Sequence, residues 1–96
     1  MNQIICDAII NKLIIELRYH EYSRHVEPHA YGRDNNGDEI LRCYQVSGGS
    51  KSGERMGWKL LKVRDVFSLA ITKTKFLPRP NYHRNDKSMQ YIFCQL

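Results

Sequence analysis

The spacing of apolar residues changes once along the chain, near Asn11, from a helical period to a strand-like one. Before that point, four apolar residues recur on one face of a helix, namely Ile4, Ile5, Ala8 and Ile9. After it, apolar residues alternate with polar ones, at positions Leu13, Ile15, Leu17 and Tyr19. The pattern predicts a short amphipathic helix over residues 2–11, packed on a sheet that begins at Leu13.

Further strands are predicted over residues 25–31, 39–47, 58–63 and 66–72, because each run alternates and is bounded by turn residues. Pro28 cannot donate a hydrogen bond to a neighbouring strand, so its strand is at an edge or is bulged there. Asn36-Gly37 accepts the positive φ of a tight turn and is the predicted hairpin tip. The fold class is therefore mainly β, with one N-terminal helix and five antiparallel strands.

The C-terminal extension, residues 78–96, is harder to assign. Pro78-Arg79-Pro80 ends the sheet, and an extended stretch follows to Asn85. Apolar residues at positions 89, 92, 93 and 96 fit a short C-terminal helix capped by Asp86, but their alternates also fit a strand. Both assignments remain open for residues 87–96.

The predicted core combines the helix stripe with the inward positions of the strands. It comprises Ile5, Ile9, Ile15, Leu17, Leu41, Cys43, Leu60, Val63 and Leu69. A chain of 96 residues is large enough for one such core, so residues 1–96 are taken as a single domain.

The composition argues against a membrane helix, a signal peptide and a disulfide framework. No apolar run approaches the roughly 20 residues of a membrane helix, and the N-terminus lacks a basic region before its apolar stretch. The three cysteines are an odd number at wide spacings, which argues against a disulfide framework. We therefore expect reduced thiols in a cytoplasmic protein with no membrane partner.

The net charge of +5 is distributed unevenly between the two halves of the chain. Residues 1–50 hold five Lys/Arg against seven Asp/Glu, whereas residues 51–96 hold ten against three. This asymmetry favours a polyanion or an acidic protein surface as a partner. A merely solvated basic face is the alternative.

Three segments follow one another along the chain: Val26-Glu27-Pro28-His29, the strand with Leu41, and Trp-Lys-Leu-Leu-Lys-Val at residues 58–63. In this order they resemble the WYL domain, a small regulatory domain found mostly in bacteria. The first resembles its Pro-containing strand, and Leu41 lies where the naming tripeptide keeps its Leu. The third resembles its Arg-rich strand, with Lys in place of both arginines, and Phe76 matches a further aromatic position. The resemblance covers residues 3–77. It implies an Sm/SH3-like bent sheet or barrel after the helix, and a ligand-binding, regulatory function.

The candidate site combines basic and aromatic residues. Arg42, Lys59, Lys62 and Arg64 would form one anion-binding patch if a bulge, or burial against the helix, brings Lys59 and Lys62 together. Tyr31 and Tyr44, on the two strands of the hairpin, would stack on bases, although they would equally fill cross-strand pair positions. Arg55 and Lys51 flank the Gly/Ser loop, where they could close over phosphate or only solubilise it.

No catalytic constellation is visible. The Gly-rich loop at residues 48–53 lacks the Gly before Lys51 that a P-loop needs, and His25 and His29 are too far apart along a strand to share a zinc ion. We therefore expect a non-enzymatic domain without cofactor or metal. Its expected ligand is single-stranded nucleic acid or a nucleotide. The alternative is an acidic partner protein, and a homodimer is left open.

Overall fold

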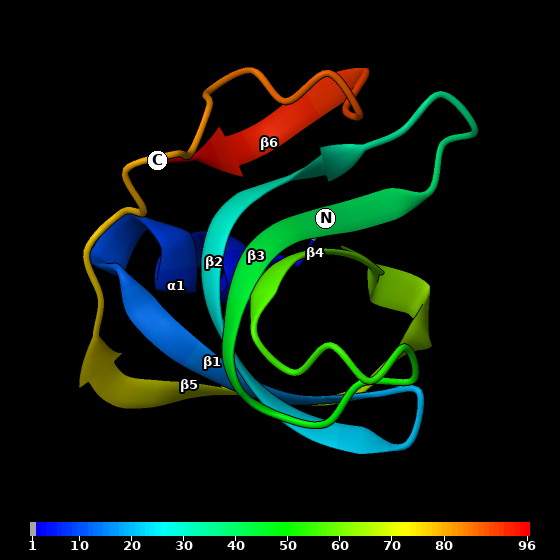
Figure 1. The fold of residues 1–96 in the computed structure, drawn as a ribbon. Helices are drawn as coiled ribbons and strands as arrows, with labels where there is room; N and C mark the ends of the chain where they lie inside the picture. The colour runs from blue at the N-terminus through cyan, green and yellow to red at the C-terminus, as the bar shows by residue number, and fades with distance from the viewer. Residues whose placement is uncertain (1) are drawn as a thin grey trace.

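The computed structural model describes residues 2–96 and shows one helix followed by a bent antiparallel sheet (Figure 1). The elements are α1 (Gln3–Asn11), β1 (Leu13–Tyr19), β2 (Tyr22–Arg33), β3 (Glu39–Gly48), β4 (Gly57–Lys62), the 3-10 turn η1 (Val63–Asp65), β5 (Val66–Lys75) and β6 (Tyr91–Gln95). The predicted fold class, mainly β with an N-terminal helix, is confirmed.

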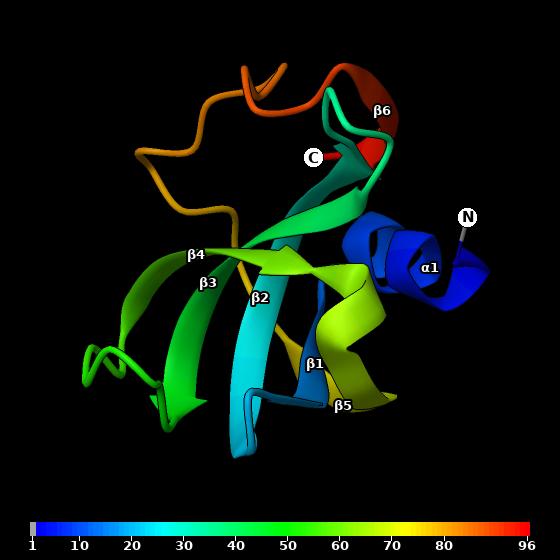
Figure 2. The ribbon, with the colours of Figure 1, turned by 90° about the vertical axis from the view of Figure 1, so that its right-hand side faces the viewer.

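The sheet has the strand order β4-β3-β2-β1-β5 and is not closed into a barrel. Its two ends, β4 and β5, are joined by η1, so the sheet curves around its own concave face (Figures 1 and 2). The hydroxyl of Tyr19 on β1 accepts a hydrogen bond from the backbone N–H of Lys62 at 3.1 Å. This bond links β1 to the end of β4 across the open part of the sheet.

Local sequence explains where α1 begins and ends. The side chain of Asn2 accepts a hydrogen bond from the backbone N–H of Ile4, which is an N-cap. Lys12 adopts a left-handed conformation (φ 53°) and ends the helix. Between these caps Ile5, Cys6, Ala8 and Ile9 are buried, whereas Ile4, expected on the same apolar face, is 48% exposed.

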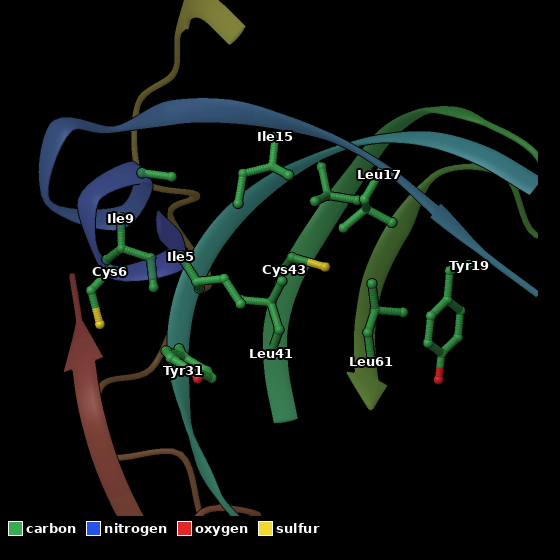
Figure 3. Packing of buried hydrophobic residues seen from close by; sticks show 12 residues of the cluster. Ile5, Cys6, Ile9, Ile15, Leu17, Tyr19, Tyr31, Leu41, Cys43 and Leu61 are labelled. Carbon is green, nitrogen blue, oxygen red and sulfur yellow. The ribbon is translucent and has the colours of Figure 1, made fainter. Parts of the chain in front are cut away.

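The core lies between α1 and the concave face of the sheet, where buried side chains from both meet (Figure 3). Six residues of the predicted core are buried, namely Ile5, Ile9, Ile15, Leu17, Leu41 and Cys43. Val63 and Leu69 are partly buried against the same cluster. The prediction is wrong for Leu60, which is 39% exposed, because Leu61 pairs with buried Leu41 and faces inward in its place.

β2 is the central strand, and its pairing explains how it accommodates a proline. On one edge, β1 pairs with β2 up to Val26, and β6 pairs with it from Ala30 onward. Pro28 lies between these two ladders, and the register with β3 shifts between Pro28 and Ala30. Pro28 thus lies where the pairing of β2 is interrupted, and of the two predicted alternatives the bulge is confirmed.

The C-terminus is a strand, which corrects the short C-terminal helix considered from the sequence. β6 occupies the edge of β2 that β1 leaves unpaired, from Ala30 to Arg33. Backbone pairing there outweighs the helical spacing of the apolar residues. At the other turn, Gly37 has φ 81°, so the hairpin tip predicted at Asn36-Gly37 is confirmed.

Cys6 and Cys94 form a disulfide, so the expectation of reduced thiols throughout is wrong. Cys6 is on α1 and Cys94 is on β6, and both elements pack beside β2. Two residues 88 positions apart thus lie next to one another, which no spacing rule reveals. Only Cys43 is a free, buried thiol within residues 2–96, and burial raises its pKa to about 12.

Candidate ligand-binding cleft

Residues 76–90, here called the strap, connect β5 to β6 and pack against the outer face of β2, β3 and β4. Figure 2 shows the strap as the yellow-orange segment that leaves β5 and passes the end of β4 before it reaches β6. It contains no helix or strand. Backbone hydrogen bonds hold its two ends, from Phe76 N–H to Lys12 O and from Gln90 N–H to Arg33 O. Between them, side-chain contacts attach the strap to the sheet, and these contacts define the candidate site.

The first anchor is the ion pair between Arg79 of the strap and Glu27 of β2. The Arg79 Nε and Nη2 atoms lie 2.8 and 3.3 Å from the two Glu27 carboxylate oxygens. The guanidinium also lies over the ring of Tyr44, 3.9 Å from its centroid. The hydrogen bond to Glu27 raises the pKa of Arg79, because it stabilises the charged form.

The second anchor is His29, which is fully buried at the base of the strap. Its Nδ1 lies 2.8 Å from the carbonyl oxygen of Glu27, and its Nε2 lies 3.1 Å from the backbone nitrogen of Arg79. Nδ1 must therefore donate and Nε2 must accept, which describes the neutral imidazole. Burial lowers the pKa of His29 and so favours this neutral form.

Aromatic rings surround His29. Its ring centroid is 4.8 Å from that of Trp58 and 5.0 Å from that of Tyr82. Trp58 and Tyr82 lie at a small interplanar angle of 29°, with centroids 6.3 Å apart. Tyr44 meets the edge of Trp58 at 5.5 Å. Trp58 of β4 and Tyr82 of the strap thus lie nearly parallel, and both rings contact the ring of His29.

An open cleft of about 610 Å³ lies between β3, β4 and the strap. Its walls carry two aromatic rings, two amides and five charged or titratable groups, from Arg42, Trp58, Asn81, Tyr82, His83, Arg84, Asn85, Asp86 and Lys87. Seven of these nine residues come from the strap, so the strap forms most of the cleft.

Arg42 and Asp86 form an ion pair in the wall of the cleft, with Nε 2.6 Å from Oδ2. Burial by itself would raise the pKa of the Asp86 carboxyl. Hydrogen bonds from Arg42 and from Ser88 outweigh that effect and leave the pKa below its usual range. Asp86 is therefore charged at neutral pH and neutralises Arg42.

Arg84 and Lys87 supply the remaining charge of the cleft. Both are exposed, and neither has an ion-pair partner within residues 2–96. His83, next to Arg84, is exposed as well. Because Asp86 is already paired with Arg42, the cleft keeps two uncompensated cations.

The structure separates the predicted basic patch. β4 pairs with β3 without a register shift, so no bulge brings Lys59 and Lys62 to one face. Lys62 and Arg64 both bind the carboxylate of Asp38, at 3.2 and 3.1 Å. The Lys59 amine instead donates to the carbonyl oxygen of Glu54 at 2.6 Å. Of the four predicted cations, only Arg42 lines the cleft.

The two predicted stacking tyrosines have different surroundings. Tyr31 is fully buried in the core, and its hydroxyl bonds to Glu39 and to the backbone of Asn2, so its ring has no face open to a ligand. Burial raises its pKa to about 12. Tyr44 is beside the cleft, but Arg79 covers its ring. Arg55 is exposed in the loop before β4 and does not line the cleft.

A row of polar side chains crosses β1, β2 and β3 elsewhere. Ser47 Oγ lies 2.9 Å from His25 Nδ1, and His25 Nε2 lies 3.1 Å from Glu16 Oε2. The order of residue types is that of a hydrolase triad. His25 and Glu16 are 41% and 59% exposed, however, and none of the three residues lines the cleft described above. The row is best described as a cross-strand hydrogen-bond ladder on the sheet surface.

Most residues of the cleft were not predicted as site residues, namely Trp58, Asn81, Tyr82, His83, Arg84, Asn85, Asp86 and Lys87. The excess of basic residues in the second half of the chain was the signal that pointed toward them. Only the contacts of Arg79 and Asp86 with the sheet show that the strap turns this charge toward β4.

No family model, curated protein or solved structure matches the chain. Within residues 2–96, no helix has the length and apolarity needed to cross a membrane. In the same range, His, Cys, Asp and Glu side chains do not gather in groups of three that would suit a metal ion. The cleft itself must therefore carry the argument about function.

Proposed function

We propose that the protein is a non-enzymatic regulatory domain that binds a phosphate-bearing ligand, single-stranded nucleic acid or a nucleotide, in the cleft between β4 and the strap. One observation carries the proposal. Two nearly parallel rings, Trp58 and Tyr82, line the same cleft as two uncompensated cations, Arg84 and Lys87.

Each half of this arrangement matches one part of a nucleotide. Bases of any sequence stack on aromatic rings, and phosphates bind unpaired Arg and Lys side chains. The cleft volume of about 610 Å³ lies within the usual range for small-molecule sites. Arg42 is neutralised by Asp86, so we assign the phosphate contacts to Arg84 and Lys87 rather than to Arg42.

The resemblance to WYL domains supports the same class of function. The bent sheet after an N-terminal helix and the Pro-containing β2 are compatible with it. We propose on this basis a WYL-like ligand-binding domain that acts on a partner activity, because residues 2–96 show no catalytic constellation in a cleft. A disulfide is rare in the cytosol, so the Cys6–Cys94 bond argues against the cytoplasmic location expected from the sequence.

The test is a titration with fluorescently labelled nucleoside monophosphates and with labelled single-stranded and double-stranded DNA and RNA, so that the signal does not depend on Trp58, the single tryptophan. Trp58→Ala should weaken nucleotide binding by about 1–3 kcal/mol and leave the salt dependence nearly unchanged, because it removes stacking. Arg84→Ala with Lys87→Ala should weaken binding and reduce the slope of log K against log salt by about one unit per lost phosphate contact.

The matched control is Lys73→Ala with Lys75→Ala, which removes the same charge from exposed positions on β5, outside the cleft. If both double variants weaken binding equally, only the net charge matters and the cleft is not the site. If no nucleotide or oligonucleotide binds at all, the proposal is wrong. The acidic partner protein is then the interpretation to test, with an acidic peptide as the first probe.

A further inference from the structure

Two aliphatic side chains project into solvent where α1, β5 and the strap meet. Leu77, the second residue of the strap, is 83% exposed, and Ile10, near the end of α1, is 65% exposed. The backbone N–H of Phe76 donates to the carbonyl oxygen of Lys12 at 3.0 Å, which ties the start of the strap to the end of the helix. Ile10 and Leu77 therefore lie within two residues of this hydrogen bond, one on each segment.

Three lysines lie at the same junction. Lys12 follows α1, and Lys75 pairs with Leu13 across β5 and β1, next to the hydrogen bond of Phe76. Lys73 is two residues earlier on β5. All three lysines are exposed, and none has an ion-pair partner within residues 2–96. The junction patch, as we call it here, consists of Ile10, Lys12, Lys73, Lys75 and Leu77.

The segments that form the junction patch carry no acidic residue. Residues 8–15 and 66–85 contain no Asp or Glu. The nearest acids along the chain are Asp7, which accepts a hydrogen bond from Gln3, and Glu16, which lies 3.1 Å from His25 on the sheet surface. The patch thus combines two exposed aliphatic side chains with a local excess of positive charge, and a surface of opposite charge is its complement.

The residue types of the junction patch favour a lipid surface over a protein partner. The core of a protein interface is depleted in Lys and is dominated by Trp, Tyr and Arg, none of which belongs to the patch. Lysine stems instead lie along apolar surface while their ammonium groups reach charged headgroups. Exposed aliphatic side chains gain free energy when they leave water for the boundary between headgroups and acyl chains.

We propose that the junction patch docks the protein on an anionic lipid bilayer. Ile10 and Leu77 enter the headgroup region, and the three lysines contact acidic headgroups around them. A protein docked in this way lies on the membrane and needs no helix that crosses it. The patch shares no residue with the cleft, so the inference does not depend on the proposed function.

Vesicle co-sedimentation tests the proposal on the unaltered protein. The protein should bind vesicles of an equimolar mixture of phosphatidylcholine and phosphatidylserine, and should not bind vesicles of phosphatidylcholine alone. Lys73→Ala with Lys75→Ala should weaken binding by about fivefold for each lysine, because each loses its attraction to the charged surface. Leu77→Ala should weaken binding by about tenfold, because it removes the apolar group that enters the bilayer.

Two control variants remove the same chemistry from elsewhere. Lys51→Ala with Arg55→Ala takes two exposed cations from the loop before β4, outside both the patch and the cleft. Phe67→Ala removes an apolar side chain that is 84% exposed, near the opposite end of β5. Both variants should bind the mixed vesicles as the unaltered protein does.

A fluorescent label locates the inserted residue directly. The introduced thiol of Leu77→Cys is the one that reacts in the folded protein, because Cys43 is buried and Cys6 is bonded to Cys94. An environment-sensitive dye at position 77 should shift to shorter wavelength on mixed vesicles. The same dye in Phe67→Cys should not shift.

Three results would overturn the proposal. The first is no binding to mixed vesicles, and the second is equal binding to mixed and neutral vesicles, since the lysines would then have no part. The third is an equal loss in Lys51→Ala with Arg55→Ala and in Lys73→Ala with Lys75→Ala, which would show that only net charge acts. Nucleotide binding is measured separately, so each proposal can fail while the other stands.

Discussion

The backbone N–H of Arg79 donates a hydrogen bond to Nε2 of His29 at 3.1 Å, although fifty residues separate the two in sequence. His29 Nδ1 meets the carbonyl oxygen of Glu27 at the same time. Both bonds exist together only in the neutral tautomer with its proton on Nδ1. The attachment of the strap, and with it the cleft, thus depends on the protonation state of one buried histidine.

We expect the free energy of unfolding to decrease as the pH falls below about 6.5, with His29 as a main cause. Burial lowers the pKa of His29 below 6.5, the ordinary value for a histidine side chain. The unfolded chain therefore binds a proton in a range where the folded protein does not, so stability rises with pH there. The contribution of His29 to stability is complete above the pKa that this histidine has in the unfolded chain. It is lost as the pH falls toward the lower pKa of His29 in the folded protein. Urea unfolding at about pH 7.5 and about pH 5.5 measures it.

His29→Gln isolates this contribution. His20, His25 and His83 remain in the variant, so the difference between the two pH profiles belongs to position 29. The variant should be less stable than the parent at neutral pH and should lose less stability on acidification. Parallel profiles would mean that His29 titrates alike in the folded and unfolded chains.

Loss of the disulfide between Cys6 and Cys94 should lower the free energy of unfolding by about 4 kcal/mol, because the bond closes a loop of nearly the whole chain. Cys6→Ser and reduction should have similar effects in urea unfolding. Thiol titration provides the check. The denatured, unreduced protein should expose one reactive thiol, that of Cys43, and three after reduction. Three thiols before reduction would show that the bond is absent in solution.

The fold could be predicted where local pattern and tertiary structure agree. The change of period near Asn11, the Asn36-Gly37 turn and the bulge at Pro28 are each determined by a few adjacent residues. β6 could not be predicted, because its conformation depends on an unpaired stretch of β2 about sixty residues earlier in the chain. The disulfide is a consequence of the same long-range placement.

The site was less accessible to sequence reasoning, and the register of β4 shows why. The sequence Trp58-Lys-Leu-Leu-Lys contains two neighbouring leucines. The alternation of inward and outward side chains therefore fits either of two frames, one with Leu60 facing the core and one with Leu61 facing it. With Leu60 expected to face the core, Lys59 and Lys62 were each expected on the wrong face of β4. The two residues of the Arg42–Asp86 ion pair are 44 positions apart in sequence, and those of the Arg79–Glu27 pair are 52 positions apart. No local motif relates residues at such separations.

The two leucines of β4 provide a matched pair of variants. Leu61 is 2% exposed and packs in the core, so Leu61→Ala should cost about 2–5 kcal/mol of unfolding free energy. Leu60 is 39% exposed, and Leu60→Ala should cost under about 1 kcal/mol. Denaturant unfolding of both at one pH gives the answer. A larger loss for Leu60→Ala would mean that β4 adopts the other frame.

The strap should depend on Arg79 more than on any other of its charged residues. Arg79 carries two hydrogen bonds to Glu27, whose side chain is only 9% exposed, and covers the ring of Tyr44. Arg79→Ala removes these contacts and leaves a nearly buried carboxylate without its partner. We expect it to lower the free energy of unfolding by about 2 kcal/mol.

The fluorescence of Trp58 gives an independent measure of the attachment of the strap, because the Trp58 ring lies beside Tyr82 of the strap. Its emission should shift to longer wavelength in Arg79→Ala as water reaches the ring. Arg79→Lys should recover only part of both effects, since an ammonium group cannot make the forked contact or lie flat on Tyr44. Arg84→Ala removes an exposed arginine of the same strap that has no ion pair, so it should change neither stability nor emission. Equal effects of Arg79→Ala and Arg84→Ala would show that charge, rather than the contact with Glu27, holds the strap in place.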